Sequence, residues 1–136
     1  MFRSWPKKRS QDAKYGNHRS ECVAGHSHRS KLEQAVCQML HLRMKAGEFV
    51  SVQAEVHQLI CGPIGHECSH RVKIESVVDF KCTKPDGGVV FCEAKGQFET
   101  PVWRLKRRLW MHWELGHLEI WGGSASNLVC KEVIGA

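Results

Sequence analysis

Residues 77–96 read VVDFKCTKPDGGVVFCEAKG, and this stretch decides the fold. Two runs rich in β-branched and aromatic residues flank the segment Lys-Pro-Asp-Gly-Gly at 84–88, whose residue types are those of a tight turn. The stretch therefore predicts a β-hairpin. Side chains alternate between the faces of a strand, so Glu93 and Lys95 point the same way, and the hairpin brings Asp79 near Glu93. Two carboxylates and an amine are thus predicted to converge at a sheet edge.

The residues before this hairpin predict one helix and one strand. Ser30 can cap a helix that contains apolar residues at helical spacing and ends at Gly47. Residues 49–56 alternate between apolar and polar types, which is typical of a half-buried strand. Its apolar face is predicted to hold Val50, Val52, Ala54 and Val56.

The residues after the hairpin predict a second helix and a further strand. Thr100 followed by Pro101 is a good helix start, and this helix is expected to run to about Leu115. Residues 118–121 read as a strand, and the tail after Gly123 has no clear pattern. With a strand over 71–82, the order α-β-β-β-α-β predicts an α/β fold, a mixed sheet flanked by helices.

Length and charge set the organisation of the chain. It has 136 residues, which suits one domain, and a formal net charge of +6. Residues 1–28 are polar and basic without periodicity, so we expect an N-terminal arm followed by a single domain over 29–136. No apolar run approaches the roughly 20 residues of a membrane helix. No apolar core follows the basic N-terminus, so we expect no secretion signal, no membrane partner and a cytoplasmic protein.

The charges are uneven along the chain. Residues 1–48 carry ten Lys or Arg and four Asp or Glu, residues 49–100 carry five and seven, and residues 101–136 carry five and three. A basic balance favours a polyanion partner such as nucleic acid, because Lys and Arg contacts release phosphate counterions. A basic protein without such a partner is the alternative.

Two carboxylates beside a lysine are the groups that metal-dependent phosphodiester hydrolysis needs. Carboxylate oxygens suit Mg²⁺, and a bound ion polarises the phosphate and lowers the pKa of a water. A lysine there can orient or deprotonate that water or stabilise negative charge. The simpler interpretation is a hairpin salt bridge between Asp79 and Lys95, worth about 0–1 kcal/mol if exposed.

Asp79, the hairpin and Glu93-Ala94-Lys95 together resemble the signature of the PD-(D/E)XK nuclease superfamily. Three segments in order, GHSHRSKLE at 25–33, KAGE at 45–48 and TPVWRLKR at 100–107, are similar to a small family of phage-encoded nuclease-like proteins. That family is close in pattern to the phage endonuclease I that resolves Holliday junctions. The resemblance covers about residues 14–121. Val78 stands where the superfamily name has a proline.

The resemblance implies a restriction-endonuclease-like fold with an active site of Glu33, Asp79, Glu93 and Lys95. Asp79, Glu93 and the Ala94 carbonyl would bind Mg²⁺, with Mn²⁺ as a substitute, and Glu33 would assist the metal or its water. Glu33 also fits a capping box with Ser30.

The implied function is a Mg²⁺-dependent endonuclease of recombination that acts on branched DNA. Because a junction needs two cuts, a homodimer is expected, joined through the basic arm. The alternative is a non-catalytic DNA-binding or phage-assembly module on the same fold.

Basic side chains near the site are candidates for DNA contacts. Arg104, Arg107 and Arg108 fall on one helical face with Lys106 to one side, whereas Leu105 and Leu109 are predicted to face the sheet. A solvated cationic face is the alternative. The tryptophans at 103, 110 and 113 are expected to pack rather than stack on bases. The other candidate contacts are Arg29, Lys31 and Gln97.

The seven cysteines are an odd count, and without a secretion signal reduced thiols are expected. Four closely spaced residues could offer zinc the four N and S ligands of a structural site, which would make the protein a zinc-stabilised adaptor. Their spacing is tighter than that of a zinc finger, so free side chains in a turn are the default. These four residues are Cys61, His66, Cys68 and His70.

Overall fold

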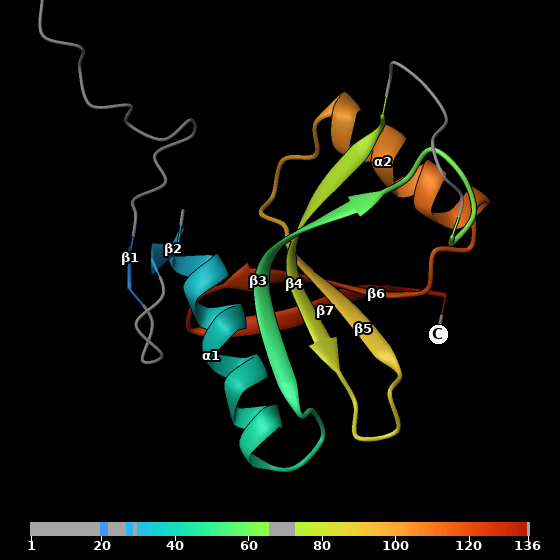
Figure 1. The fold of residues 1–136 in the computed structure, drawn as a ribbon. Helices are drawn as coiled ribbons and strands as arrows, with labels where there is room; N and C mark the ends of the chain where they lie inside the picture. The colour runs from blue at the N-terminus through green and yellow to red at the C-terminus, as the bar shows by residue number, and fades with distance from the viewer. Residues whose placement is uncertain (1–19, 22–26, 29, 66–72, 136) are drawn as a thin grey trace, which may run out of the picture.

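The computed structural model describes residues 20–21, 27–28, 30–65 and 73–135. The fold is α/β, with two helices on a five-stranded mixed sheet (Figure 1). Neighbouring strands of the sheet are consecutive in the chain. They are β3 (Ser51–Leu59), β4 (Glu75–Thr83), β5 (Val89–Ala94), β6 (His117–Ser124) and β7 (Asn127–Ile134).

One pair of neighbouring strands needs a crossover connection. β5 and β6 run parallel, and the other three neighbouring pairs run antiparallel. Parallel strands cannot be joined by a tight turn, and α2 (Pro101–His112) supplies the crossover. The predicted hairpin turn forms, with the Lys84 N–H donating to the Gly88 carbonyl at 2.7 Å. A separate pair, β1 (Ser20–Glu21) and β2 (Ser27–His28), precedes α1 (Lys31–Lys45).

α1 begins where the sequence predicts. The Ser30 hydroxyl accepts a hydrogen bond from the Glu33 N–H at 3.1 Å, which satisfies one of the donors left unpaired at a helix N-terminus. The helix buries Val36, Cys37 and Leu40 against the sheet. Ser30 therefore fixes both the start of α1 and the position of Glu33.

Replacing Ser30 by alanine is expected to destabilise the protein by about 1 kcal/mol, because the cap is lost, whereas glycine should cost only a few tenths. Urea unfolding of the two variants measures the difference. Equal stabilities for the wild type and the alanine variant would show that the cap contributes nothing.

α2 is shorter than predicted, and of the two leucines predicted to face the sheet only Leu109 packs against the core. The Thr100 hydroxyl caps it by accepting from the Trp103 N–H at 3.1 Å, and the helix ends at His112 rather than near Leu115. Trp103 and Trp110 are buried, as expected, but Leu105 is 57% exposed, which corrects the prediction that it faces the sheet. Trp103 and Trp110, seven positions apart, lie on one face of the helix and pack in the same cluster, and Leu105 lies off that face.

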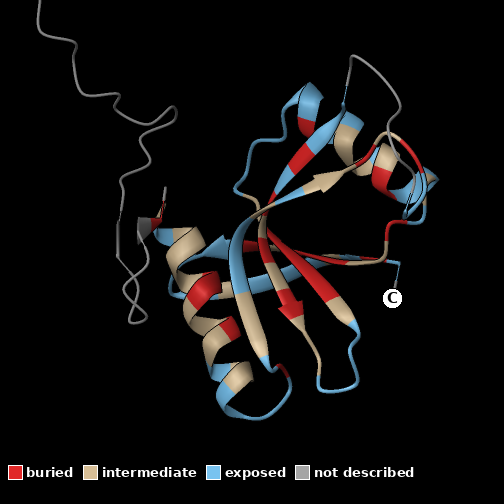
Figure 2. Cartoon of the chain, in the orientation of Figure 1, coloured by how far each residue is buried: buried red, intermediate tan, exposed pale blue. Residues whose placement is uncertain are grey.

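The core lies on both faces of the sheet (Figure 2). Under α1, Leu40 and Phe49 pack with Phe80. Under α2, Trp103 and Trp110 pack with Val78, Ile60 and the strand residues of β5 and β6. β5 is covered on both faces, so four of its six residues are buried.

The edge strands depart from the sequence prediction. Val50, which precedes β3, is 61% exposed, and Ala54 of β3 is also exposed, which corrects the prediction that both lie on an apolar face. β7, which the sequence leaves unassigned, completes the sheet by pairing with β6. No helix in the described ranges has the length and apolarity to span a membrane.

An ion-pair network joins the end of α1 to β6. The Arg43 guanidinium donates to Glu119 at 2.8 Å and, through Nε, to Glu48 at 2.8 Å. It also lies 4.7 Å from the centroid of the Phe49 ring. The indole of Trp121 donates to Glu119 at 3.1 Å. Burial alone would raise the pKa of Glu119, but these donors outweigh it and lower that pKa.

Candidate active site

The site forms where β4 and β5 separate. The two strands pair from Thr83 opposite Val89 to Phe80 opposite Cys92, and beyond that point β4 continues in its ladder with β3 alone. Asp79 directly precedes Phe80, the last residue of β4 that pairs with β5. Its Oδ2 accepts a hydrogen bond from the Ala94 N–H at 2.8 Å, in place of a strand carbonyl. The separation therefore carries the Asp79 carboxylate to the end of β5.

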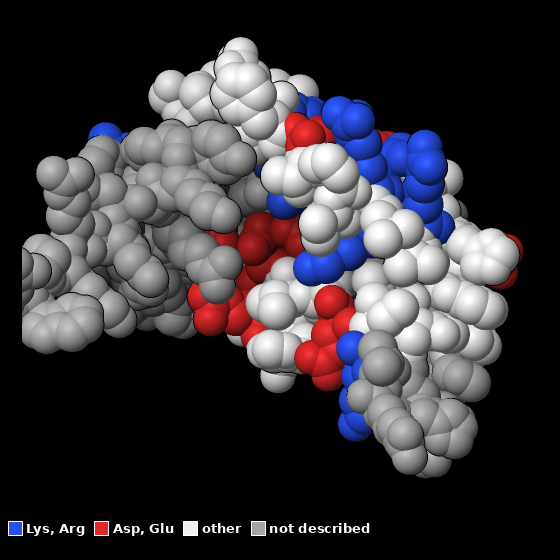
Figure 3. Space-filling view, turned by 90° about the horizontal axis from the view of Figure 1, so that it is seen from above, with Lys and Arg blue, Asp and Glu red and all other residues white. Residues whose placement is uncertain are grey.

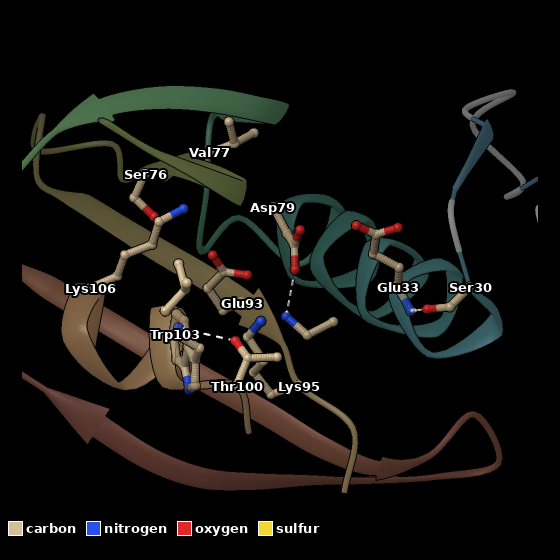
Figure 4. A pocket seen from close by; sticks show the side chains of 12 residues that line it. Ser30, Glu33, Ser76, Val77, Asp79, Glu93, Lys95, Thr100, Trp103 and Lys106 are labelled. Atoms are coloured by element: carbon tan, nitrogen blue, oxygen red, sulfur yellow. Dashed lines mark hydrogen bonds between the residues drawn. The ribbon is translucent and has the colours of Figure 1, made fainter. Parts of the chain in front are cut away.

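The space between the diverging strands is a pocket of about 440 Å³. Glu33, Asp79, Glu93 and Lys95 all line it, and Figure 4 shows their polar ends directed into it. The structure brings together at one pocket the three residues of the predicted hairpin site and Glu33, which the resemblance had added to them. The other lining residues are Ser30, Ser76, Val77, Ala94, Thr100, Val102, Trp103 and Lys106. Figure 3 shows acidic side chains recessed in a hollow, with Lys and Arg side chains beside it.

The two central carboxylates are hard to ionise together. Burial raises the pKa of Asp79 well above its usual value, and the negative charge of Glu93 raises it further; hydrogen bonds that the Asp79 carboxylate accepts from Glu33 and from the Ala94 N–H oppose the rise. Burial also raises the pKa of Glu93, which is 5% exposed. Two like charges in a poorly solvated site repel, so the pair holds a proton more tightly than free carboxylates do.

The Asp79→Asn variant is expected to be more stable than the wild type at about pH 8, with the difference disappearing towards about pH 4. Both pKa values are raised on folding, so the folded state keeps a proton that the unfolded chain has already lost. The wild type therefore loses stability as the pH rises through the window above the unfolded pKa, and the amide removes the part of that loss that comes from Asp79. Urea unfolding across this pH range measures it.

Asp86→Asn is the matched control, because the exposed Asp86 carboxylate also accepts a backbone N–H, from Gly88 at 2.8 Å. It should show little pH-dependent change. An Asp79→Asn variant less stable than the wild type at about pH 8 would contradict the electrostatic account.

Lys95 is held by contacts from two elements. Its N–H donates to the Trp121 carbonyl of β6 at 2.7 Å, and its Nζ lies 4.5 Å from the centroid of the Trp103 ring of α2. An ammonium over an indole face is a favourable cation–π contact. The sequence predicted Trp103 as a packing residue, and it also positions Lys95. Trp103 follows Lys95 by eight residues and contacts its amine because α2 crosses back over the sheet.

Lys106 belongs to the site more closely than the sequence suggests. It is half-buried on the inner side of α2, lines the pocket and lowers the pKa of Glu93 against the effect of burial. Ser76, 4% exposed, and Val77 of β4 also line the pocket and were missed, since nothing in their spacing marks them. Both residues belong to the N-terminal part of β4, which no longer pairs with β5 and therefore lies at the pocket.

The predicted cationic face of α2 is divided. Arg107 forms a two-point ion pair with Glu132 of β7, with Nε donating at 3.0 Å, which raises its pKa. Arg104 lies 3.7 Å from Glu99 and is exposed, as is Arg108. Lys106, predicted to lie to one side of these arginines, is the one of the four basic residues of α2 that lines the pocket.

Two of the remaining predicted DNA contacts, Lys31 and Gln97, do not line the pocket. Lys31 is exposed at the first position of α1, and Gln97 is exposed two residues after Lys95. Arg29 lies outside the described residues.

The pocket carries the donor set that a divalent cation prefers. Two carboxylates with raised pKa values, the half-buried Asp79 and the buried Glu93, supply hard oxygen ligands together with a third acid, Glu33, and a cation would relieve their repulsion. As they stand, no three His, Cys, Asp or Glu side chains in the described part of the chain are close enough to hold a metal ion. The residues fit Mg²⁺ in their chemistry.

The predicted zinc residues are placed only in part. Cys61 is disulfide-bonded, so its sulfur is not a thiolate ligand, and His66, Cys68 and His70 lie outside the described residues. Cys37, Cys82 and Cys92 are buried reduced thiols, and Cys130 is an exposed one. The expectation of reduced thiols holds at these four cysteines and not at Cys61.

Comparison of the chain with protein-family models, with curated proteins and with solved structures finds no match. The geometry and electrostatics of the pocket are therefore the basis for a functional proposal.

Proposed function

We propose that the protein is a Mg²⁺-dependent endonuclease that hydrolyses DNA phosphodiester bonds, on a restriction-endonuclease-like fold. The observation that carries the proposal is the pocket itself, where Asp79, Glu93 and Lys95 meet at the end of β5. Carboxylates for a metal and an amine for a developing negative charge are the groups that phosphodiester hydrolysis requires.

Each acidic group has a role in this proposal. Asp79, Glu93 and the Ala94 carbonyl would hold Mg²⁺, and Glu33 would accept a hydrogen bond from the attacking water or from a water beside the cation. When bound, the ion polarises the phosphate and lowers the pKa of its water. The hydrogen bond from the Ala94 N–H keeps Asp79 oriented towards this position.

The cations would act on the phosphate. The Lys95 ammonium, held over the Trp103 ring, is a preorganised positive charge beside the reacting group. Lys106 extends positive charge along the pocket, and the exposed Arg104 and Arg108 can contact the DNA backbone on either side. Such contacts position DNA without reading its sequence.

A branched DNA, such as a Holliday junction, is the substrate we propose. A junction is resolved by two symmetric cuts, so two copies of the chain would act as a homodimer. The experiment compares a four-way junction, a flap and a linear duplex, each with Mg²⁺, with Mn²⁺ and with EDTA. We expect metal-dependent cutting with the junction preferred. If none of the three substrates is cut with either metal, the proposed nuclease activity is excluded.

A non-catalytic DNA-binding or phage-assembly module is the second candidate. It is favoured by one observation, that the described side chains present no three-ligand group ready for a metal. Such a module would bind DNA with a steep salt dependence and cut none. The same assay with binding measured in parallel separates the two.

A further inference from the structure

A β-bulge in β7 redirects the side chain of Lys131. Ile120 of β6 pairs with Glu132, and the next residue, Trp121, pairs with Cys130, so Lys131 is an extra residue in the ladder. A bulge bends its strand and re-aims the side chain that it carries. Here the redirected side chain crosses β6 towards β5.

Lys131 reaches the backbone next to the candidate site. Its Nζ donates to the carbonyl of Lys95 at 3.3 Å and to that of Gly96 at 3.2 Å. These carbonyls follow directly after Ala94, the last residue of β5, where the chain leaves the sheet. The amine of Lys131 therefore fixes the peptide units on the C-terminal side of Lys95.

Gly122 leaves the space through which Lys131 passes. A Cβ added at Gly122 would lie 2.7 Å from Nζ and 2.8 Å from Cδ of Lys131. Gly122 is buried in β6, and its φ lies outside the left-handed region, so its backbone does not itself require glycine. The missing side chain matters here for room, which ties Gly122 to the path of Lys131.

We propose that Lys131, passing over Gly122, is a positioning residue that fixes the backbone at Lys95 and thereby aims its amine into the pocket. Lys95 is then held at three points: by Trp121 at its N–H, by Trp103 at its amine and by Lys131 at its carbonyl. The kinetic consequence of this arrangement rests on the proposed nuclease function. The structural consequence does not.

The test uses Lys131→Met, Gly122→Ala and the double variant in the full chain. Methionine keeps the apolar stem and removes the donor, whereas alanine keeps the donor and blocks its path. In both, exchange of the Lys95 amide hydrogen, which is bonded to the Trp121 carbonyl, should speed up by about fivefold to tenfold, because release of the neighbouring Lys95 and Gly96 carbonyls lets this segment open more often, with amides elsewhere in β6 and β7 unchanged. The double variant should show no more than either single one, because both remove the same contact.

The kinetic arm measures DNA cleavage by the same proteins. We expect kcat to fall by about tenfold to a hundredfold with KM unchanged, since a displaced amine fails in the transition state rather than in binding. Lys45→Met, an exposed lysine in the last turn of α1, is the matched control and should leave both readouts unchanged.

Unchanged exchange at Lys95 in Lys131→Met would overturn the proposal, as would equally faster exchange throughout β6 and β7, which indicates general destabilisation. Additive effects in the double variant would disprove the shared path. If Gly122→Ala does not fold, Lys131→Met alone decides. If the wild type cuts no DNA, the nuclease proposal fails, and the exchange measurement still decides whether Lys131 positions Lys95.

Discussion

Replacing Lys95 by methionine is expected to lower kcat for DNA cleavage by about 10²–10³-fold while DNA binding changes little. Methionine keeps an apolar stem against Trp103 but removes the charge that faces the developing negative charge on the phosphate. Single-turnover cleavage with Mg²⁺, combined with a binding titration in EDTA, separates the chemical step from affinity. Asp79→Asn should abolish cleavage in the same assay.

Lys106→Met is the informative comparison for this prediction. Lys106 lies in the same pocket, and its loss should weaken binding more than it lowers kcat, because it contacts backbone phosphate in the proposal. Lys45→Met should match the wild type. Full activity of the Lys95 or Asp79 variant would show that the site assignment is wrong.

Replacing Arg43 by methionine is expected to destabilise the protein by about 3 kcal/mol at neutral pH. The substitution leaves Glu119, which is 7% exposed, without its cation, and it removes the contact with the Phe49 ring. Folding lowers the pKa of Glu119, so its ionised form contributes stability above the unfolded pKa, and this contribution is lost as the pH falls through the folded pKa. The difference in the free energy of unfolding between the wild type and the variant should therefore become smaller at acidic pH, as measured by urea unfolding.

Two further variants test the origin of that loss. Glu48 is about half exposed, so Glu48→Gln should cost less than about 1 kcal/mol even though it bonds the same guanidinium. Adding Glu119→Gln to Arg43→Met should recover a good part of the stability, because the uncompensated buried charge is gone. If the double variant recovers no stability, the loss in Arg43→Met comes from the missing contact with Phe49 rather than from electrostatics.

Local patterns in the sequence predicted the hairpin and the two helix starts. Turn residues at 84–88 set the pairing of β4 with β5, and that short-range register is what brings Asp79 beside Glu93. The caps Ser30 and Thr100 act within one turn of their own helices, so their roles follow from neighbouring residues. The assignment of Glu33 to the site rested instead on a family resemblance. Local patterns could not predict it, because its place in the pocket depends on how α1 packs on the sheet.

The features that the sequence could not predict depend on contacts between distant elements. The hairpin pattern gives no sign that β4 leaves β5 at Asp79. The exposure of Leu105 depends on the rotation of α2 over the sheet. The position of Lys131 depends on a bulge in β7, a strand without a clear sequence pattern. In each case tertiary packing decides between local alternatives of similar energy.

The separation of β4 from β5 also has a thermodynamic consequence. The N-terminal part of β4, before Asp79, packs with the core under α2 through Val78. Phe80, after Asp79, belongs to the core under α1. Asp79 thus sits at the boundary between two halves of the hydrophobic interior. A cation bound by Asp79 and Glu93 would join these halves, and by mass action it stabilises only the state in which both are folded. We expect saturating Mg²⁺ to raise the midpoint of urea unfolding and to make the two halves unfold in a single, more cooperative transition.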